Sequence, residues 1–240
     1  MKQDIKKLKY IINQDSKTIF FGGAGVSTES GIPDFRGKDG LYNQKHNYDP
    51  EYLLSLTGFR AHPDAFWEFY REMLLLSNVK PNKGHLALAK LEKDGKLQAI
   101  VTQNIDHLHE LAGSKNVYHL HGTIMTNHCL TCNQAYSFDE IQQMPTIPKC
   151  HCGGIIKPDV VFFEEMLPED AWQKSLDAIR QANTLIVAGT SLSVYPAASL
   201  ITEFSGENLI IINRDETGAE DMATIVIRDS FAEVLDQVVN

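Results

Sequence analysis

The sequence lacks any apolar run of the roughly 20 residues that a membrane-spanning helix needs. Its first residues, 1–13, mix lysines with isoleucines and leucine at helical spacing and contain no continuous apolar stretch of the kind found in a secretory signal. We therefore expect no membrane anchor and a cytoplasmic protein.

Positive charge is also scarce, because 22 lysines and arginines stand against 31 aspartates and glutamates, for a formal net charge of -9. A surface of this sign repels the phosphates of nucleic acid, and no cluster of basic residues compensates for it. We expect no direct contact with nucleic acid. Such a charge also keeps many proteins soluble, so it identifies no partner by itself.

Cysteine is rare, and the four in the sequence lie in one short window. Two residues separate Cys129 from Cys132, and seventeen residues later a single residue separates Cys150 from Cys152. Two such pairs are typical of knuckles that hold one tetrahedral zinc ion with four thiolates. A shell of four protein ligands leaves no position for a water nucleophile, so we expect this zinc to be structural.

Two alternatives to a four-cysteine zinc site stay open at this point. The cysteines could form two disulfides, although disulfides rarely persist in a reducing compartment. The second pair is also one residue shorter than the usual knuckle, so neighbouring His128 or His151 could replace one of the thiolates.

Five short apolar runs are continuous rather than alternating, as expected for strands of a parallel sheet that is covered on both faces. They are residues 18–21, 99–101, 184–188, 209–212 and 223–227. Helical patterns lie between them, for example over 85–94 and 168–182. The sequence therefore predicts an α/β fold, a Rossmann-like parallel sheet with helices on both faces.

Two stretches interrupt this alternation. We interpret residues 37–81, with a helical pattern around 59–76, as a small helical insertion, and residues 122–156 as a small zinc-binding module. We expect the two to pack together. The Rossmann-like domain then consists of residues 14–36, 82–121 and 157–240, within a single unit that spans 1–240.

Small and polar residues follow all five expected strands, at the edge where open α/β sheets bind ligands. The Gly-x-Gly of residues 23–25 could bring backbone amides to a pyrophosphate at the start of a helix, or could be only a tight turn. Thr28 replaces the third glycine of the dinucleotide fingerprint. This disfavours a dehydrogenase that transfers a hydride.

Two further segments offer chemistry at strand ends. Residues 102–106 place two amides and a carboxylate there, which could read a carboxamide or could merely cap a helix. His119 and His121 share one face of an extended segment, where a histidine is either a base or a core residue. Gly122 lets a ligand come close and favours His121.

In order and spacing these motifs resemble the sirtuin family, in particular a single-domain member of the bacterial type. The resemblance covers nearly the whole chain from residue 18 onward. The matching parts are residues 23–36, 102–106, Leu108 with His109, His121 with Gly122, the cysteine pairs, residues 157–161, residues 189–191, residues 194–196 and Asn213.

The resemblance implies an NAD-dependent protein lysine deacetylase. In this reaction the amide oxygen of an acyl-lysine attacks the anomeric carbon of the nicotinamide ribose, nicotinamide leaves, and the acyl group ends on ADP-ribose. NAD is then a co-substrate, the Rossmann-like domain is its binding domain, and the partners are acetyl-lysine proteins or peptides. Nothing in the sequence requires more than a monomer.

Similarity assigns His121 as the general base and Asn104 as the residue that positions the ribose and a water. The strand that pairs with the substrate backbone would comprise Val160, Val161, Phe162 and Phe163. The remaining assigned residues would contact NAD: Ala24, Thr28, Phe35, Arg36, Gln103, Ile105, Asp106, Gly189, Thr190, Ser191, Asn213 and Ser230.

Two departures from the family pattern concern the substrate. Glu164 and Glu165 stand where the strand usually ends in a Gly-Glu pair, which leaves the path of the substrate clamp open. Sirtuins that prefer acidic acyl groups carry a Tyr-x-x-Arg pair, whereas Tyr70 is followed three positions later by Met73. We therefore predict neutral acyl groups, acetyl first.

Two other functions remain as alternatives. The same cleavage of NAD could end in ADP-ribosylation of a protein, as a side activity of a deacylase of neutral acyl groups. A chain of another class would bind NAD or ADP-ribose as a sensor without catalysis, but such a chain would have no need of His121.

Overall fold

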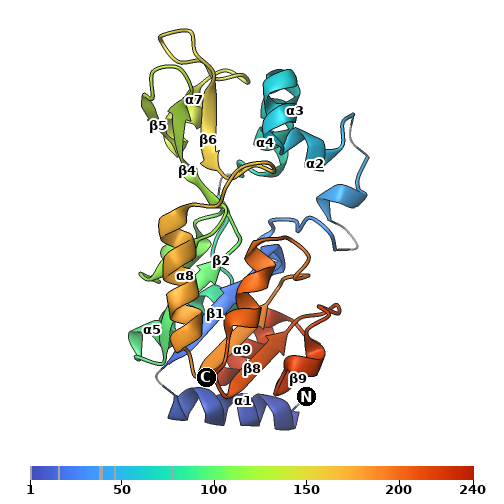
Figure 1. The fold of residues 1–240 in the computed structure, drawn as a ribbon, viewed down its shortest axis with the longest axis vertical. Coiled ribbons are helices and arrows are strands. Elements are labelled where there is room, and N and C mark those ends of the chain that lie inside the picture. The colour runs from blue at the N-terminus through green and yellow to red at the C-terminus, as the bar shows by residue number, and fades with distance from the viewer. Residues whose placement is uncertain (1, 16, 38–39, 46, 77) are drawn as a thin grey trace.

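The structure is a computed structural model that describes residues 2–15, 17–37, 40–45, 47–76 and 78–240. Its larger part is a six-stranded parallel sheet with helices on both faces, as predicted (Figure 1). The strand order is β3-β2-β1-β7-β8-β9. The strands are β1 (Thr18–Gly22), β2 (Leu97–Thr102), β3 (Val117–His119), β7 (Thr184–Ala188), β8 (Asn208–Ile212) and β9 (Ile225–Ile227).

Helices cover the sheet from two sides because successive residues of each strand point to opposite faces. Phe20 of β1 packs in the core that α1, α5 and α9 cover, whereas Ile19 and Phe21 pack in the core that α8 and η4 cover. The helices of this part are α1 (Lys2–Gln14), α5 (Lys83–Lys93), α6 (Leu108–Leu111), α8 (Glu169–Gln181), the 3-10 helix η4 (Ala197–Glu203) and α9 (Phe231–Val239). Within the described ranges, no helix is both long and apolar enough to cross a bilayer.

The strand order determines where a ligand can enter the large sheet. β1 and β7 are neighbours at the centre of the sheet. From β1 the chain continues outward to β2 and β3 on one side, and from β7 it continues to β8 and β9 on the other. In open α/β sheets the crevice at the carboxyl ends of such a central pair is the usual ligand site.

A smaller part lies beyond the carboxyl end of the large sheet, at the top of Figure 1. There Phe66 and Trp67 of the helical insertion share a third core with Ile141 and Ile156 of the cysteine module, so the two insertions pack together as expected. The elements are α2 (Pro50–Leu53), α3 (Leu56–Ala61), α4 (Pro63–Met73), α7 (Phe138–Gln143) and an antiparallel sheet, order β5-β4-β6, of β4 (Gly122–Cys129), β5 (Ala135–Ser137) and β6 (Ile156–Val160).

Three local features differ from the sequence prediction. The helical pattern around 59–76 is divided at His62, because Pro63 lacks an N–H and starts the new helix α4. The glycine-rich segment after β1 forms short 3-10 turns, Ala24–Val26 and Thr28–Ser30, instead of opening an α-helix. β3 is an additional strand at the edge of the large sheet.

Candidate active site

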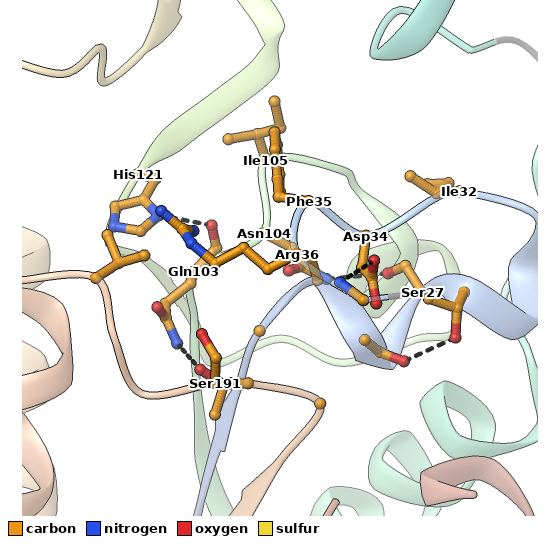
Figure 2. A pocket seen from close by; sticks show the side chains of 18 of the residues that line it. Ser27, Ile32, Asp34, Phe35, Arg36, Gln103, Asn104, Ile105, His121 and Ser191 are labelled. Atoms are coloured by element: carbon orange, nitrogen blue, oxygen red, sulfur yellow. Dashed lines mark hydrogen bonds between the residues drawn. The ribbon is translucent and has the colours of Figure 1, made fainter. Parts of the chain in front are cut away.

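A cleft of about 900 Å³ lies between the carboxyl end of the large sheet and the smaller part of the molecule. Figure 2 shows side chains from several separate segments around it. Of the residues that the sequence assigned to NAD or substrate, those lining the cleft are Ala24, Thr28, Phe35, Arg36, Gln103, Asn104, Ile105, Asp106, His121, Val160, Val161, Phe162, Phe163, Gly189, Thr190, Ser191 and Asn213.

Ser230 is the assigned residue that the structure does not bring to the cleft lining. Its hydroxyl donates a hydrogen bond to the carboxylate of Glu29 and accepts one from the backbone N–H of Glu233 at 3.2 Å. The second bond caps the first turn of α9. Ser230 therefore has a structural role that its place after a strand did not reveal.

Two glycines bring the loops after β1 and β7 into contact. The amide of Gly25 donates to the carbonyl of Gly189 at 2.8 Å. A Cβ on residue 25 would lie 2.8 Å from the Cα of Gly189, and Gly189 itself adopts a left-handed φ of 59°. Side chains are excluded at both positions, so main chain forms the cleft wall at the centre of the sheet.

Ser27 connects the side chains of Asn104 and Asp106, which follow β2. It is 1% exposed, its hydroxyl donates to Asp106 Oδ2 at 2.7 Å, and it accepts from Asn104 Nδ2 at 3.0 Å. Burial raises the pKa of Asp106, although its bonds from Ser27 and the Leu108 amide act in the opposite direction. The bond from Leu108 N, at 3.1 Å, also satisfies an amide at the start of α6, so the capping alternative holds in part.

His121 presents a neutral imidazole to the cleft. Its Nδ1 lies 2.9 Å from the carbonyl oxygen of Gln103, and a carbonyl can only accept, so Nδ1 carries a proton. Burial lowers the pKa of His121, and the bond to Gln103 offsets this only in part. At neutral pH the ring therefore holds its free lone pair on Nε2, the nitrogen that can accept a proton.

His119 has a different environment. Its Nε2 lies 2.6 Å from Glu110 Oε1 and its Nδ1 lies 3.3 Å from the carbonyl of Asn104, so both ring nitrogens face acceptors. Burial by itself would lower the pKa of His119, but the bond and charge of Glu110 outweigh it and raise the pKa. His119 thus contacts the Asn104 backbone and a carboxylate, while His121 contacts only the preceding carbonyl.

Side-chain hydrogen bonds also tie the strand ends together on the other side of β1. Gln103 Nε2 donates to Thr190 Oγ1 at 3.1 Å, across β1. Asn213 Oδ1 accepts from the Thr190 amide at 3.2 Å, and its Nδ2 donates to the Asp215 carbonyl at 2.9 Å. The ends of β2, β7 and β8 are therefore fixed relative to one another along the cleft.

Phe35 and Arg36 approach the cleft from the loop after β1. The ring of Phe35 packs edge-on against Tyr42 at 5.5 Å, and the Arg36 guanidinium lies 5.0 Å from the centre of the same ring. Arg36 also pairs with Glu51 at 3.4 Å. Burial raises the pKa of Tyr42 to about 12, so its phenol is neutral at ordinary pH.

The segment that the resemblance predicted as a substrate-pairing strand is regular only at its start. β6 ends at Val160, and the residues after it leave the small sheet. The amide of Val161 donates to the His121 carbonyl at 2.9 Å, and the amide of Phe163 donates to the Leu54 carbonyl at 2.9 Å. The segment thus crosses from His121 to the helical insertion and forms one wall of the cleft.

The four cysteines fit a metal ion. Their sulfur atoms lie within 4.8 Å of one another and none is joined in a disulfide. The pairs Cys129–Cys152 and Cys132–Cys150 are each 3.5 Å apart, close to the roughly 3.8 Å between thiolates around a tetrahedral zinc. His128 instead contacts Asp159 at 2.8 Å. The geometry agrees with four thiolate ligands despite the short second knuckle.

Some cleft residues were missed from the sequence. Ser27 and Ile32 lie inside the motif of residues 23–36, so their place in the motif could have identified them as cleft residues. Leu54 and Leu74 come from the helical insertion. Leucines in an apolar helical pattern look like core residues, so no local signal identifies them as cleft lining.

A family model described as the Sir2 family matches residues 23–196. The chain belongs to the Sir2 family. Relatives include a protein of Clostridium acetobutylicum named NAD-dependent protein deacetylase, which is 54% identical over 98% of both chains. A protein of Clostridium perfringens with the same name is 52% identical over 100% of both chains. The resemblance to sirtuins is therefore confirmed over the whole sequence.

Solved Sir2 structures share this fold. A complex described as Sir2 with a p53 peptide and NAD⁺ has a TM-score of 0.86 at 38% identity, over 98% of this chain and 96% of that chain. A Sir2 structure described as bound to an acetylated peptide has a TM-score of 0.85 at 37% identity over the same shares of both chains.

Proposed function

We propose that this Sir2-family chain is an NAD-dependent protein deacetylase, which transfers the acetyl group of acetyl-lysine to ADP-ribose and releases nicotinamide. The position of His121 carries the proposal. Its neutral ring lines the same cleft as the loops after β1, β2 and β7, and its carbonyl accepts from Val161. A candidate base, the loops that would bind a dinucleotide and the segment that would pair with a peptide therefore line one cleft.

His121 acts as the general base in this proposal, because Nε2 is the free acceptor for a proton from a ribose hydroxyl. Asn104 positions the ribose and a water, with its amide fixed by Ser27. Ile105 and Asp106 bind the carboxamide of nicotinamide. When bound, NAD supplies the sugar carbon that accepts the acyl group.

The rest of the dinucleotide would lie along the strand ends. Main-chain amides near Ala24 and the side chains of Thr28, Arg36 and Gln103 would contact ribose and phosphates, and Phe35 would exclude water from the reacting carbon. The adenosine half would meet Gly189, Thr190, Ser191 and Asn213. Ser230 stays a proposed contact of this half, because Asp229 and Phe231 on either side of it and its partner Glu29 line the cleft.

We also propose that Cys129, Cys132, Cys150 and Cys152 hold a structural zinc ion. All four ligands come from the protein, so the ion would cross-link two loops and leave no open position for substrate. The chain would then work as a single catalytic unit, in which the NAD-binding domain and the two insertions enclose the cleft.

The apolar character of the cleft under the insertions supports neutral acyl groups. Leu54, Leu74, Ile105 and Phe162 line it there, and Tyr70 is fully buried in the third core behind it. No cationic group among these residues could pair with a succinyl carboxylate. We propose acetyl-lysine as the preferred substrate, and a succinyl peptide that reacts faster would contradict this.

The test is incubation with NAD and an acetyl-lysine peptide. Nicotinamide release should depend on both, and mass spectrometry should find O-acetyl-ADP-ribose. ADP-ribose attached to a protein would indicate the transferase alternative, and NAD binding without any turnover would indicate a sensor. His121→Ala should abolish turnover and leave ADP-ribose binding within about twofold; unchanged turnover would remove the base assignment.

A further inference from the structure

Lys157 is a lysine whose ammonium group is almost completely enclosed. It is the second residue of β6, and its side chain is 12% exposed. Nζ donates to the carbonyl of Val160 at 2.8 Å and to that of Pro158 at 3.2 Å, and it lies 2.9 Å from Glu165 Oε2. All three protons of the ammonium therefore have acceptors, one of them the carbonyl of Val160 in the cleft wall.

Phe162 completes this environment. Its ring centre lies 4.0 Å from Lys157 Nζ, and its backbone N–H donates to Glu165 Oε2 at 2.8 Å. The backbone N–H of Glu165 in turn donates to the Phe162 carbonyl at 3.1 Å. One charged pair thus fixes both the ring and the backbone of a residue that is 2% exposed and lines the cleft.

The ring of Phe162 also packs against Phe59 and Phe66, with ring centres 5.3 and 5.1 Å apart, whereas its backbone has fewer attachments. The regular strand ends at Val160, so the ladder of β4 no longer holds the chain. Val161 is bonded to the His121 carbonyl and Phe163 to Leu54, which leaves Phe162 between them. Glu165 supplies the hydrogen-bond partners of both the backbone N–H and the carbonyl of Phe162, and Lys157 holds the Glu165 carboxylate in place. A lysine this deeply buried is rarely found without such a partner.

We infer that Lys157 and Glu165 are positioning residues for the acyl-lysine, acting through Phe162 and the Val160–Val161 backbone. This inference rests on the proposed deacetylase function. Neither side chain needs to touch the substrate, because together they fix the position of the Phe162 ring and backbone against which the acyl-lysine packs. The partners of Lys157 lie in β6 and in the segment that directly follows it, away from the loops after β1, β7 and β8, so NAD binding should be independent of the pair.

A purely structural ion pair makes a different prediction. Its loss would lower thermal stability and reduce peptide and nucleotide binding together. A positioning pair raises the KM for peptide selectively, because only the peptide wall moves. Separate measurement of the two ligands distinguishes these cases.

The experiment compares four variants with the wild-type chain. Lys157→Met removes the charge and keeps the length, Lys157→Arg restores a cation, and Glu165→Gln keeps an acceptor for the Phe162 amide. Lys174→Met is the matched control, because Lys174 lies on α8 and pairs there with the exposed Asp170. Steady-state kinetics with an acetyl-lysine peptide gives KM and kcat, and calorimetry with ADP-ribose reports the nucleotide site.

Lys157→Met should raise the peptide KM at least about tenfold with ADP-ribose affinity within about twofold, and Lys157→Arg should recover most of the loss. Glu165→Gln should raise KM in the same selective way, and Lys174→Met should not change it. A folded Lys157→Met with wild-type KM, or equal losses for peptide and ADP-ribose, would overturn the inference. If Lys157→Met does not fold, Glu165→Gln decides by the same criteria.

Failure of the proposed function would look different. The wild-type chain would then release no nicotinamide in response to the peptide. Fluorescence anisotropy with a labelled acetyl-lysine peptide would still compare wild type with Lys157→Met and Glu165→Gln. Equal peptide affinity in all three would reject the positioning role on its own.

Discussion

Acidification should destabilise this fold through two buried histidines that take no part in the proposed reaction. His85 of α5 and His109 of α6 are 0% and 1% exposed, and their ring centres lie 4.8 Å apart. In the described part of the chain, His85 Nε2 and both ring nitrogens of His109 have no hydrogen-bond partner. A charge on either ring would therefore be buried without compensation.

The size of the effect follows from the pKa difference between the folded and unfolded chain. Burial lowers the pKa of His85 to about 4, from the 6.5 of an exposed imidazole. Between these two pKa values His85 is protonated in the unfolded chain but not in the folded chain, so the stability of the fold decreases as the pH falls. From about pH 6 to about pH 5 this costs about 1 kcal/mol for His85.

His109 should add a loss in the same direction, because burial lowers its pKa well below the usual value as well. His119 acts in the other direction, since its pKa is raised and its stabilisation is lost as the pH rises through that value. Its stabilisation is present below the ordinary pKa of an imidazole, so it does not contribute to a loss of stability on acidification. A total stability of 5–15 kcal/mol is typical of such domains, so two such losses are a measurable fraction.

The assay is urea unfolding followed by circular dichroism at about pH 6 and about pH 5, for wild type and for His85→Gln. Comparing the two chains cancels the protonation of the cysteine thiolates, which both share. The variant should lose about 1 kcal/mol less per pH unit than wild type, whatever its absolute stability. An identical slope in both chains would refute the reasoning, because it would show that His85 is not excluded from protonation in the native state.

Three further predictions concern the active site and the metal. In kcat/KM for the acetyl peptide, the acid limb of the pH profile should have a midpoint below 6.5, because burial lowers the pKa of His121; a midpoint above 7 would contradict a neutral base. Gly25→Ala should weaken ADP-ribose binding at least about tenfold, measured by calorimetry, since the new Cβ would meet Gly189 at 2.8 Å; unchanged binding would show that the loops can separate freely. Removal of zinc by a chelator, followed by metal analysis and thermal unfolding, should lower Tm by several degrees for a cross-link of about 2–4 kcal/mol, whereas an unchanged Tm would exclude a structural metal.

The large sheet could be predicted because its central strands are covered on both faces. Phe20 and Phe21 face different cores and both must be apolar, so the run carries a strong local signal. β3 carries little signal, because its three residues are only partly buried at the sheet edge. The break at Pro63 was readable in principle, but the apolar pattern continues across it and concealed the change of helix.

The candidate site could be predicted as a set of segments but not as a network. His121 was favoured over His119 by a neighbouring glycine, and the structure gives the physical difference: one ring faces a single carbonyl and the other faces a carboxylate as well. Ser27 bridges residues 77 and 79 positions away, a contact that no local pattern encodes. Ser230 shows the converse, since a helix cap and a ligand contact use the same kind of residue at a strand end.

The third core has a consequence for how this molecule would respond to oxidants. Cys129 and Cys150 are buried in the same core as Leu54 and Phe162, whereas the dinucleotide loops rest on the large sheet. Thiol oxidation that expels the metal would thus loosen the cleft wall at Phe162 first and leave the loops after β1, β7 and β8 in place. An oxidised chain would then bind acetyl-lysine peptides less tightly while it still binds NAD.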